Sequence, residues 1–127
     1  MSKNKQLFLA LNYIVCIIAV FHITMVSIQF NFDFSPQGRM THPGMAIAFL
    51  TACTLNITRL NESKASLRIN KVSFFANLLT LSLAIAFTVQ NPVLPKLITT
   101  SLMLLITLES VFVLFKYKLK NKQVVQV

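Results

Sequence analysis

Charged residues are scarce in this chain, and acidic residues are scarcer than basic ones. Only 12% of the 127 residues are charged, which is about half the usual share in soluble proteins, and only three are acidic. The hydrophobic share is 55%, which argues against a soluble globular domain. The twelve basic residues lie between long apolar runs and are not mixed with stacking aromatic residues. Nucleic acid is therefore not expected as a partner.

The chain also has few of the residues on which other small folds depend. Two glycines and four prolines exclude collagen-like and linker-like sequences, and two cysteines cannot form a disulfide scaffold. Enzymes need a nucleophile with a base, paired acids or a metal cage, and the three acids and two histidines are too scattered to supply one. We therefore predict that the protein is not an enzyme and has no cofactor and no metal site.

Four long apolar stretches are what the sequence does contain. They cover residues 7–30, 43–60, 72–90 and 97–117. Each is close to the roughly 20 residues that a helix needs to cross a bilayer. Hydrocarbon offers no partner for free backbone groups, and no stretch alternates polar with apolar residues as a barrel strand does, so only helices fit. The sequence predicts an all-α polytopic membrane protein, with four transmembrane helices in one domain over residues 1–127.

Basic residues gather at one end of the predicted helices and predict their orientation. The ten at this end are Lys3, Lys5, Arg59, Lys64, Arg68, Lys71, Lys116, Lys118, Lys120 and Lys122. The opposite end has only Arg39 and Lys96. The positive-inside rule then places both termini in the cytoplasm, with the basic residues beside anionic membrane lipids.

Small residues recur at every fourth position in the second apolar stretch. Gly44, Ala48 and Ala52 share one helix face with Asn56. Stripes of this kind let helices approach closely where lipid supplies no hydrophobic drive for association. We expect the stripe to pack inside the bundle, and the alternative is contact with a second protein.

One polar residue of each predicted helix falls at a similar depth in the membrane. Counted at 1.5 Å per residue from the cytoplasmic ends, Asn12, Asn56, Asn77 and Glu109 lie roughly 7 to 11 Å inside. A charged carboxylate at this depth is costly, so we expect Glu109 to be protonated, hydrogen-bonded to the amides or paired with a basic residue. The basic residues at the rim are Arg59 and Lys116. We favour an interhelical clasp, and a proton or cation site is the alternative.

Three short motifs resemble a family of transporter subunits. They are Ala19-Val20-Phe21-His22, then Arg39 and His42 before the run from Met45 to Leu50, and finally Leu108-Glu109. In this order they are similar to the small four-helix membrane component of tripartite ATP-independent periplasmic (TRAP) transporters, most closely in the TAXI-type branch. The resemblance covers about half of the chain, chiefly residues 17–60 and 104–116.

This resemblance implies partners and a location. A large permease subunit would carry the substrate and ion sites, and a periplasmic solute-binding protein would deliver an organic acid at the bacterial inner membrane. The small component would be an accessory scaffold. His22, Arg39 and His42 would then be contact residues on the periplasmic side, and Glu109 would be structural.

Two other functions stay open from the residues alone. A small oligomeric exporter or channel would use Glu109 as its coupling carboxylate. A membrane-embedded metal-handling or regulatory protein would use His22, His42 and the nearby methionines, because imidazoles and thioethers can hold copper. Metal binding is the less expected of the two, because methionine is ordinary filler of hydrophobic cores.

Overall fold

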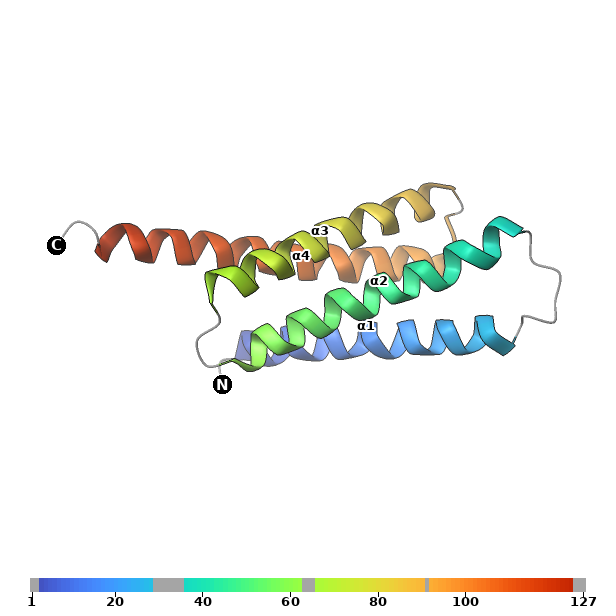
Figure 1. Ribbon diagram of the computed structural model, residues 1–127, viewed down its shortest axis with the longest axis horizontal. Coiled ribbons are helices and arrows are strands. Elements are labelled where there is room, and N and C mark those ends of the chain that lie inside the picture. Colours follow the sequence, from blue (N-terminus) through green and yellow to red (C-terminus); the bar gives the residue numbers. More distant parts are fainter. Residues whose placement is uncertain (1–2, 29–35, 63–65, 91, 125–127) are drawn as a thin grey trace.

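The protein is a bundle of helices connected by short links. The structure, a computed structural model, describes residues 3–28, 36–62, 66–90 and 92–124, and the side chains of residues 4–24, 44–62, 66–90 and 92–117. Over these residues it forms four helices: α1 (Lys3–Ile28), α2 (Pro36–Asn61), α3 (Leu67–Gln90) and α4 (Leu94–Val124). They run alternately in opposite directions (Figure 1). Each packs on the next along the chain, and α4 contacts α1 less extensively. The predicted all-α class is confirmed.

All four helices begin earlier than predicted, and α3 has a capping side chain before its first turn. The Ser66 side-chain oxygen accepts a hydrogen bond from the backbone N–H of Ile69 at 3.3 Å, so Ser66 is the N-cap of α3. At the start of α4 the backbone carbonyl of Val93 accepts hydrogen bonds from the N–H groups of Lys96 and Leu97, which are the first backbone bonds of that helix. Pro95 lies in the first turn of α4, where its missing N–H is not needed.

The start of the second helix differs most from the predicted helix starts, and the end of α4, at Val124, lies seven residues beyond its predicted end. α2 begins at Pro36, seven residues before the predicted start at residue 43. Proline is well suited to a first helical position, because its backbone angle φ is already helical. Pro43 therefore lies inside α2, where it removes one backbone hydrogen bond. The side chains of Arg39 and His42 lie outside the described residues.

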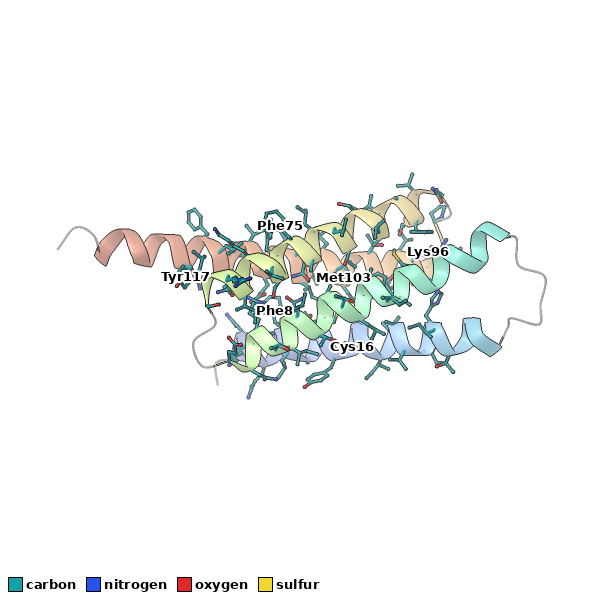
Figure 2. All side chains as sticks on the ribbon, viewed as in Figure 1. Phe8, Cys16, Phe75, Lys96, Met103 and Tyr117 are labelled. Atoms are coloured by element: carbon teal, nitrogen blue, oxygen red, sulfur yellow. The ribbon has the colours of Figure 1, made fainter. Side chains whose placement is uncertain are left out.

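The apolar core lies in the middle of the bundle. Met103 and Ile106 of α4 form one buried cluster with residues of the other three helices, and Figure 2 shows Met103 at the centre. Cys53 of α2 belongs to this cluster, and Cys16 of α1 packs against it; both thiols are free. The two cysteines therefore lie on the faces by which α1 and α2 pack at mid-bundle.

The outer surface is apolar, whereas part of the interior is polar. Large side chains such as Phe21, Leu79 and Phe112 are more than half exposed. The buried residues of α3 are Asn70, Ser73, Asn77, Thr80, Leu81, Ala84 and Thr88, most of them polar. A water-soluble protein rarely exposes such a large apolar surface, whereas lipid solvates it well.

Hydroxyl groups on the outer surface are hydrogen-bonded to their own helix. Each donates to the carbonyl oxygen four residues earlier, at 2.8 to 3.0 Å; the residues are Thr24, Thr51, Thr58, Ser82 and Ser101. These bonds satisfy the hydroxyl donors without water. The exposed faces of the helices are therefore compatible with hydrocarbon.

Three of the four helices are long and apolar enough to cross a membrane. The candidate spans are Asn4–Thr24, Leu67–Gln90 and Leu94–Tyr117. The predicted fourth span, in α2, is not among those found in the described residues. The part of α2 with described side chains contains Asn56, Arg59 and Asn61, which lower its mean hydropathy.

Candidate functional site

Two asparagines on neighbouring helices form the centre of a buried polar cluster. Asn56 of α2 donates to the side-chain oxygen of Asn77 of α3 at 2.7 Å, and Asn77 donates back at 3.1 Å. Asn77 also donates to the hydroxyl of Ser110 on α4 at 2.6 Å. The Ser110 hydroxyl donates in turn to the carbonyl of Ile106 at 3.2 Å. The cluster thus ties three helices together through fully buried groups.

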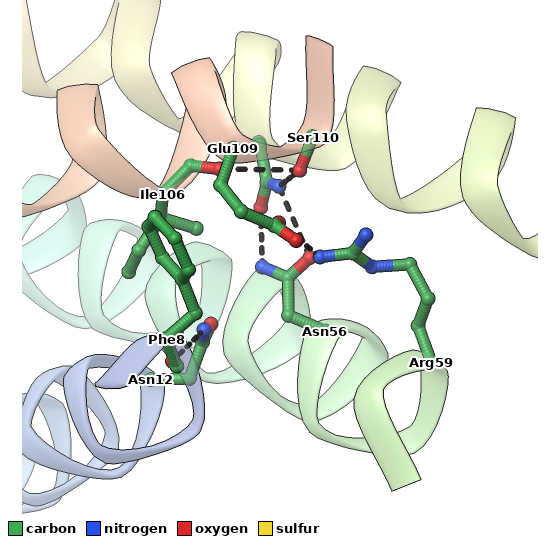
Figure 3. Close-up of polar contacts among 8 residues, drawn as sticks. Phe8, Asn12, Asn56, Arg59, Ile106, Glu109 and Ser110 are labelled. Atoms are coloured by element: carbon green, nitrogen blue, oxygen red, sulfur yellow. Dashed lines mark hydrogen bonds and ion pairs between the residues drawn. The ribbon is translucent and has the colours of Figure 1, made fainter. Parts of the chain in front are cut away.

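An ion pair extends the cluster toward the end of the bundle where the termini lie. Arg59 lies almost one turn after Asn56 on α2, and its guanidinium is paired with the carboxylate of Glu109, the neighbour of Ser110 on α4 (Figure 3). The two side chains are only 3% and 10% exposed, so the pair is shielded from solvent and lipid. A buried charge is tolerated when a partner neutralises it in this way. Arg59 is one of the two basic residues that the sequence placed within reach of Glu109.

Asn12 lies at the predicted depth but makes a different contact. Its side chain is buried on α1, and its amide group donates to the carbonyl of Phe8 in the same helix at 2.7 Å (Figure 3). The Asn12 side-chain oxygen has no hydrogen-bond partner among the described residues. Of the four residues of the predicted polar layer, Asn56 and Asn77 are thus hydrogen-bonded to each other, and Glu109 lies beside them in its ion pair. Asn12 lies outside this network.

Two participants of the site were not singled out from the sequence. Ser110 completes the hydrogen bonds of Asn77, and Ser73 lies fully buried one turn before Asn77 on α3. The hydroxyl of Ser73 and the Nε atom of Arg59 have no hydrogen-bond partner in the described part of the chain. The spacing of residues 70, 73, 77 and 80 along α3 is helical and could have revealed this polar face.

The small-residue stripe of α2 runs from the surface into the bundle. Gly44 is exposed and has open space around it, Ala48 is partly buried, and Ala52 is fully buried. The carbonyl of Ala48 accepts a hydrogen bond from the hydroxyl of Thr80 on α3 at 3.4 Å. The inner part of the stripe thus lets α3 approach the backbone of α2 closely.

The opposite end of the bundle contains a cavity rather than a polar cluster. His22 of α1 is exposed and lines this cavity, together with Lys96 of α4. Of the three residues predicted to make contacts on the periplasmic side, only His22 has a described side chain. The buried polar cluster and the cavity therefore lie toward opposite ends of the bundle.

Comparison of the chain with protein-family models, curated proteins and solved structures gives no match. The class of protein follows from the chain itself. It is an all-α bundle with an apolar surface and a polar cluster inside, and three of its helices have the length and composition of membrane-spanning helices. These are the features of an integral membrane protein.

Proposed function

We propose that the protein is the small, four-helix scaffold subunit of a TRAP-type transporter of the TAXI branch, located in the bacterial inner membrane. Its partners would be a large permease subunit and a periplasmic solute-binding protein that delivers an organic acid. The observation that supports a scaffold is the Arg59–Glu109 pair. The single intramembrane acid is neutralised inside the bundle, and the polar groups beside it hold helices together.

An exporter would need its carboxylate to exchange protons or cations during transport. Glu109 is instead enclosed at the α2–α4 contact by the guanidinium of Arg59. Releasing it would leave Arg59 buried without its counter-charge. The arrangement therefore favours a static structural role over a coupling role.

A fourth membrane span in α2 belongs to the same proposal. Two of its polar residues, Asn56 and Arg59, point into the bundle and are buried. The exposed hydroxyls of Thr51 and Thr58 are bonded to carbonyls of α2 itself. The outer surface of α2 is thus less polar than its amino-acid composition suggests. The helix can therefore lie in lipid once the neighbouring helices cover its polar face.

The orientation follows from charge. Both termini lie at the same end of the bundle (Figure 1), and the order of the sequence assigns ten of the twelve basic residues to that end. The positive-inside rule places this end in the cytoplasm, and it places the cavity end with Lys96 on the periplasmic side.

Two measurements test the proposed function. The tagged chain, purified in mild detergent from its native membrane, should carry with it a large polytopic protein in a fixed ratio, identified by mass spectrometry. Reconstituted alone in liposomes, it should give no ion or organic-acid flux above that of empty vesicles. Recovery of homo-oligomers alone, together with a flux that is lost in Glu109→Gln, would establish the exporter instead.

A further inference from the structure

A cavity of about 140 Å³ lies between the four helices at the end opposite the polar cluster. Three alanines from three different helices, Ala19, Ala46 and Ala84, form much of its wall. Methyl side chains at these positions leave space that a leucine would fill. An apolar cavity of about 150 Å³ is large enough to hold a benzene-sized guest.

The threonines around the cavity do not make it polar. Thr88 and Thr100 are hydrogen-bonded to each other at 2.8 Å, and Thr100 also lies 3.4 Å from the carbonyl of Ala84. The hydroxyl of Thr99 donates to the carbonyl of Lys96 at 3.0 Å. Because these hydroxyls are engaged with each other and with the backbone, they are not free to hold water in the cavity.

The cavity lies beside the contact between α1 and α4, which is less extensive than the contacts between helices that follow each other along the chain. Ile18 and His22 line it from α1, and Lys96 and Thr99 line it from α4. His22 is exposed and Lys96 is partly exposed, so this side of the cavity faces the surroundings of the bundle. In a membrane those surroundings are lipid, and the α1–α4 seam gives lipid access to the cavity.

The residues that line the cavity include one lysine and no acid, which favours a negatively charged ligand. Lys96 lies in the first turn of α4, at the edge of the span Leu94–Tyr117, and therefore at the level of lipid head groups. The acids with described side chains, Glu62 and Glu109, are both at the other end of the bundle. A lysine at the membrane surface attracts anionic lipid.

We propose that this cavity is a binding site for one acyl chain of an anionic phospholipid, which enters between α1 and α4 with its phosphate at Lys96. The volume admits a segment of the chain, and the remainder lies along the seam. This site requires only that the protein lies in a membrane, so the lipid proposal does not depend on the proposed role in a transporter.

Native mass spectrometry of the full chain in detergent tests the proposal. The protein is mixed with phosphatidylglycerol or with phosphatidylcholine that carries the same acyl chains. We expect one tightly retained lipid, with phosphatidylglycerol preferred about fivefold, the factor expected for one lysine at the membrane surface. Lys96→Gln should remove this preference while one lipid of either kind is still retained.

A matched pair of substitutions on α3 tests the cavity itself. Ala84→Leu fills the cavity and should abolish the retained lipid, whereas Ala86→Leu, at an exposed position two residues later, should leave it unchanged. If circular dichroism shows that Ala84→Leu does not fold, Ala46→Leu fills the same cavity from α2 and decides in its place. Equal lipid retention in the folded cavity-filling variant and in Ala86→Leu would overturn the proposal, as would a preference for phosphatidylglycerol that survives Lys96→Gln.

Discussion

Removing either member of the Arg59–Glu109 pair should destabilise the bundle far more than removing both. The side chains of Arg59 and Glu109 are only 3% and 10% exposed. Glu109→Leu therefore leaves a buried guanidinium without a counter-charge, and Arg59→Leu leaves a buried carboxylate without one. Breaking a buried pair in this way costs about 3–5 kcal/mol, whereas replacing both members by apolar residues is often close to neutral. The double variant should therefore recover most of the loss.

The magnitude is read from a double-mutant cycle. Each single variant should lower the free energy of unfolding by about 3–5 kcal/mol, and the coupling energy between the two should be at least about 3 kcal/mol. The assay is equilibrium unfolding in mixed micelles of dodecyl maltoside and dodecyl sulfate, followed by far-ultraviolet circular dichroism. Glu62→Leu is the matched control, because Glu62 is an exposed acid at the end of the same helix bundle, and its effect should stay within about 0.5 kcal/mol.

Additive effects would refute this reasoning. If the double variant loses the sum of the two single losses, within about 0.5 kcal/mol, the two charges do not compensate each other. A Glu109→Leu variant as stable as the Glu62→Leu control would show in addition that Arg59 finds another partner. Either outcome would also remove the main support for a scaffold role.

The remaining predictions concern single contacts and topology. Ser73→Ala removes a buried hydroxyl that has no hydrogen-bond partner in the described part of the chain, so it should stabilise the bundle in the same micelle assay by about 1 kcal/mol. Ser110→Ala removes a bonded hydroxyl and should destabilise the bundle by a similar amount; equal effects would contradict the hydrogen-bond assignment. Copper–phenanthroline oxidation should join Cys16 and Cys53 in a disulfide and so protect both from later maleimide labelling under denaturing conditions. In Cys53→Ser, Cys16 should stay reactive. Labelling of both cysteines in the oxidised wild type would argue against the α1–α2 pairing. A reporter active only in the periplasm should give no signal when fused to Val127, and activity there would invert the proposed orientation.

The depth of a polar residue could be predicted from the sequence, but the direction in which it points could not. Counting along the helices placed Asn12, Asn56 and Asn77 at one level, and the structure joins only the last two. Depth depends on the rise per residue, which is the same in every helix. The direction depends on how each helix is rotated about its axis, and packing against neighbours decides that rotation. Asn12 therefore bonds to its own helix although its level is similar.

The helix starts were missed for a related reason. Hydropathy follows the apolar residues, whereas a helix begins where a capping group satisfies its first N–H groups. Ser66 and Pro36 precede the apolar stretches, so the sequence pattern placed the starts of α3 and α2 too late. The partner of Glu109 was predictable only as one of two basic residues, since distance along the chain does not reveal which of them faces α4.

The separation of Arg59 and Glu109 along the chain has a consequence for biosynthesis. The two residues are 50 positions apart, so the ribosome delivers the guanidinium well before its carboxylate. In the proposed topology Arg59 of α2 has no counter-charge until α4 has been inserted. α2 is also the one helix that is not among the apolar spans found in the described residues. The insertion machinery would therefore hold α1 and α2 as an unfinished hairpin and release the chain into lipid only after α4 has been made. A nascent chain truncated before residue 109 should then remain at the insertion machinery, although three of its helices are complete.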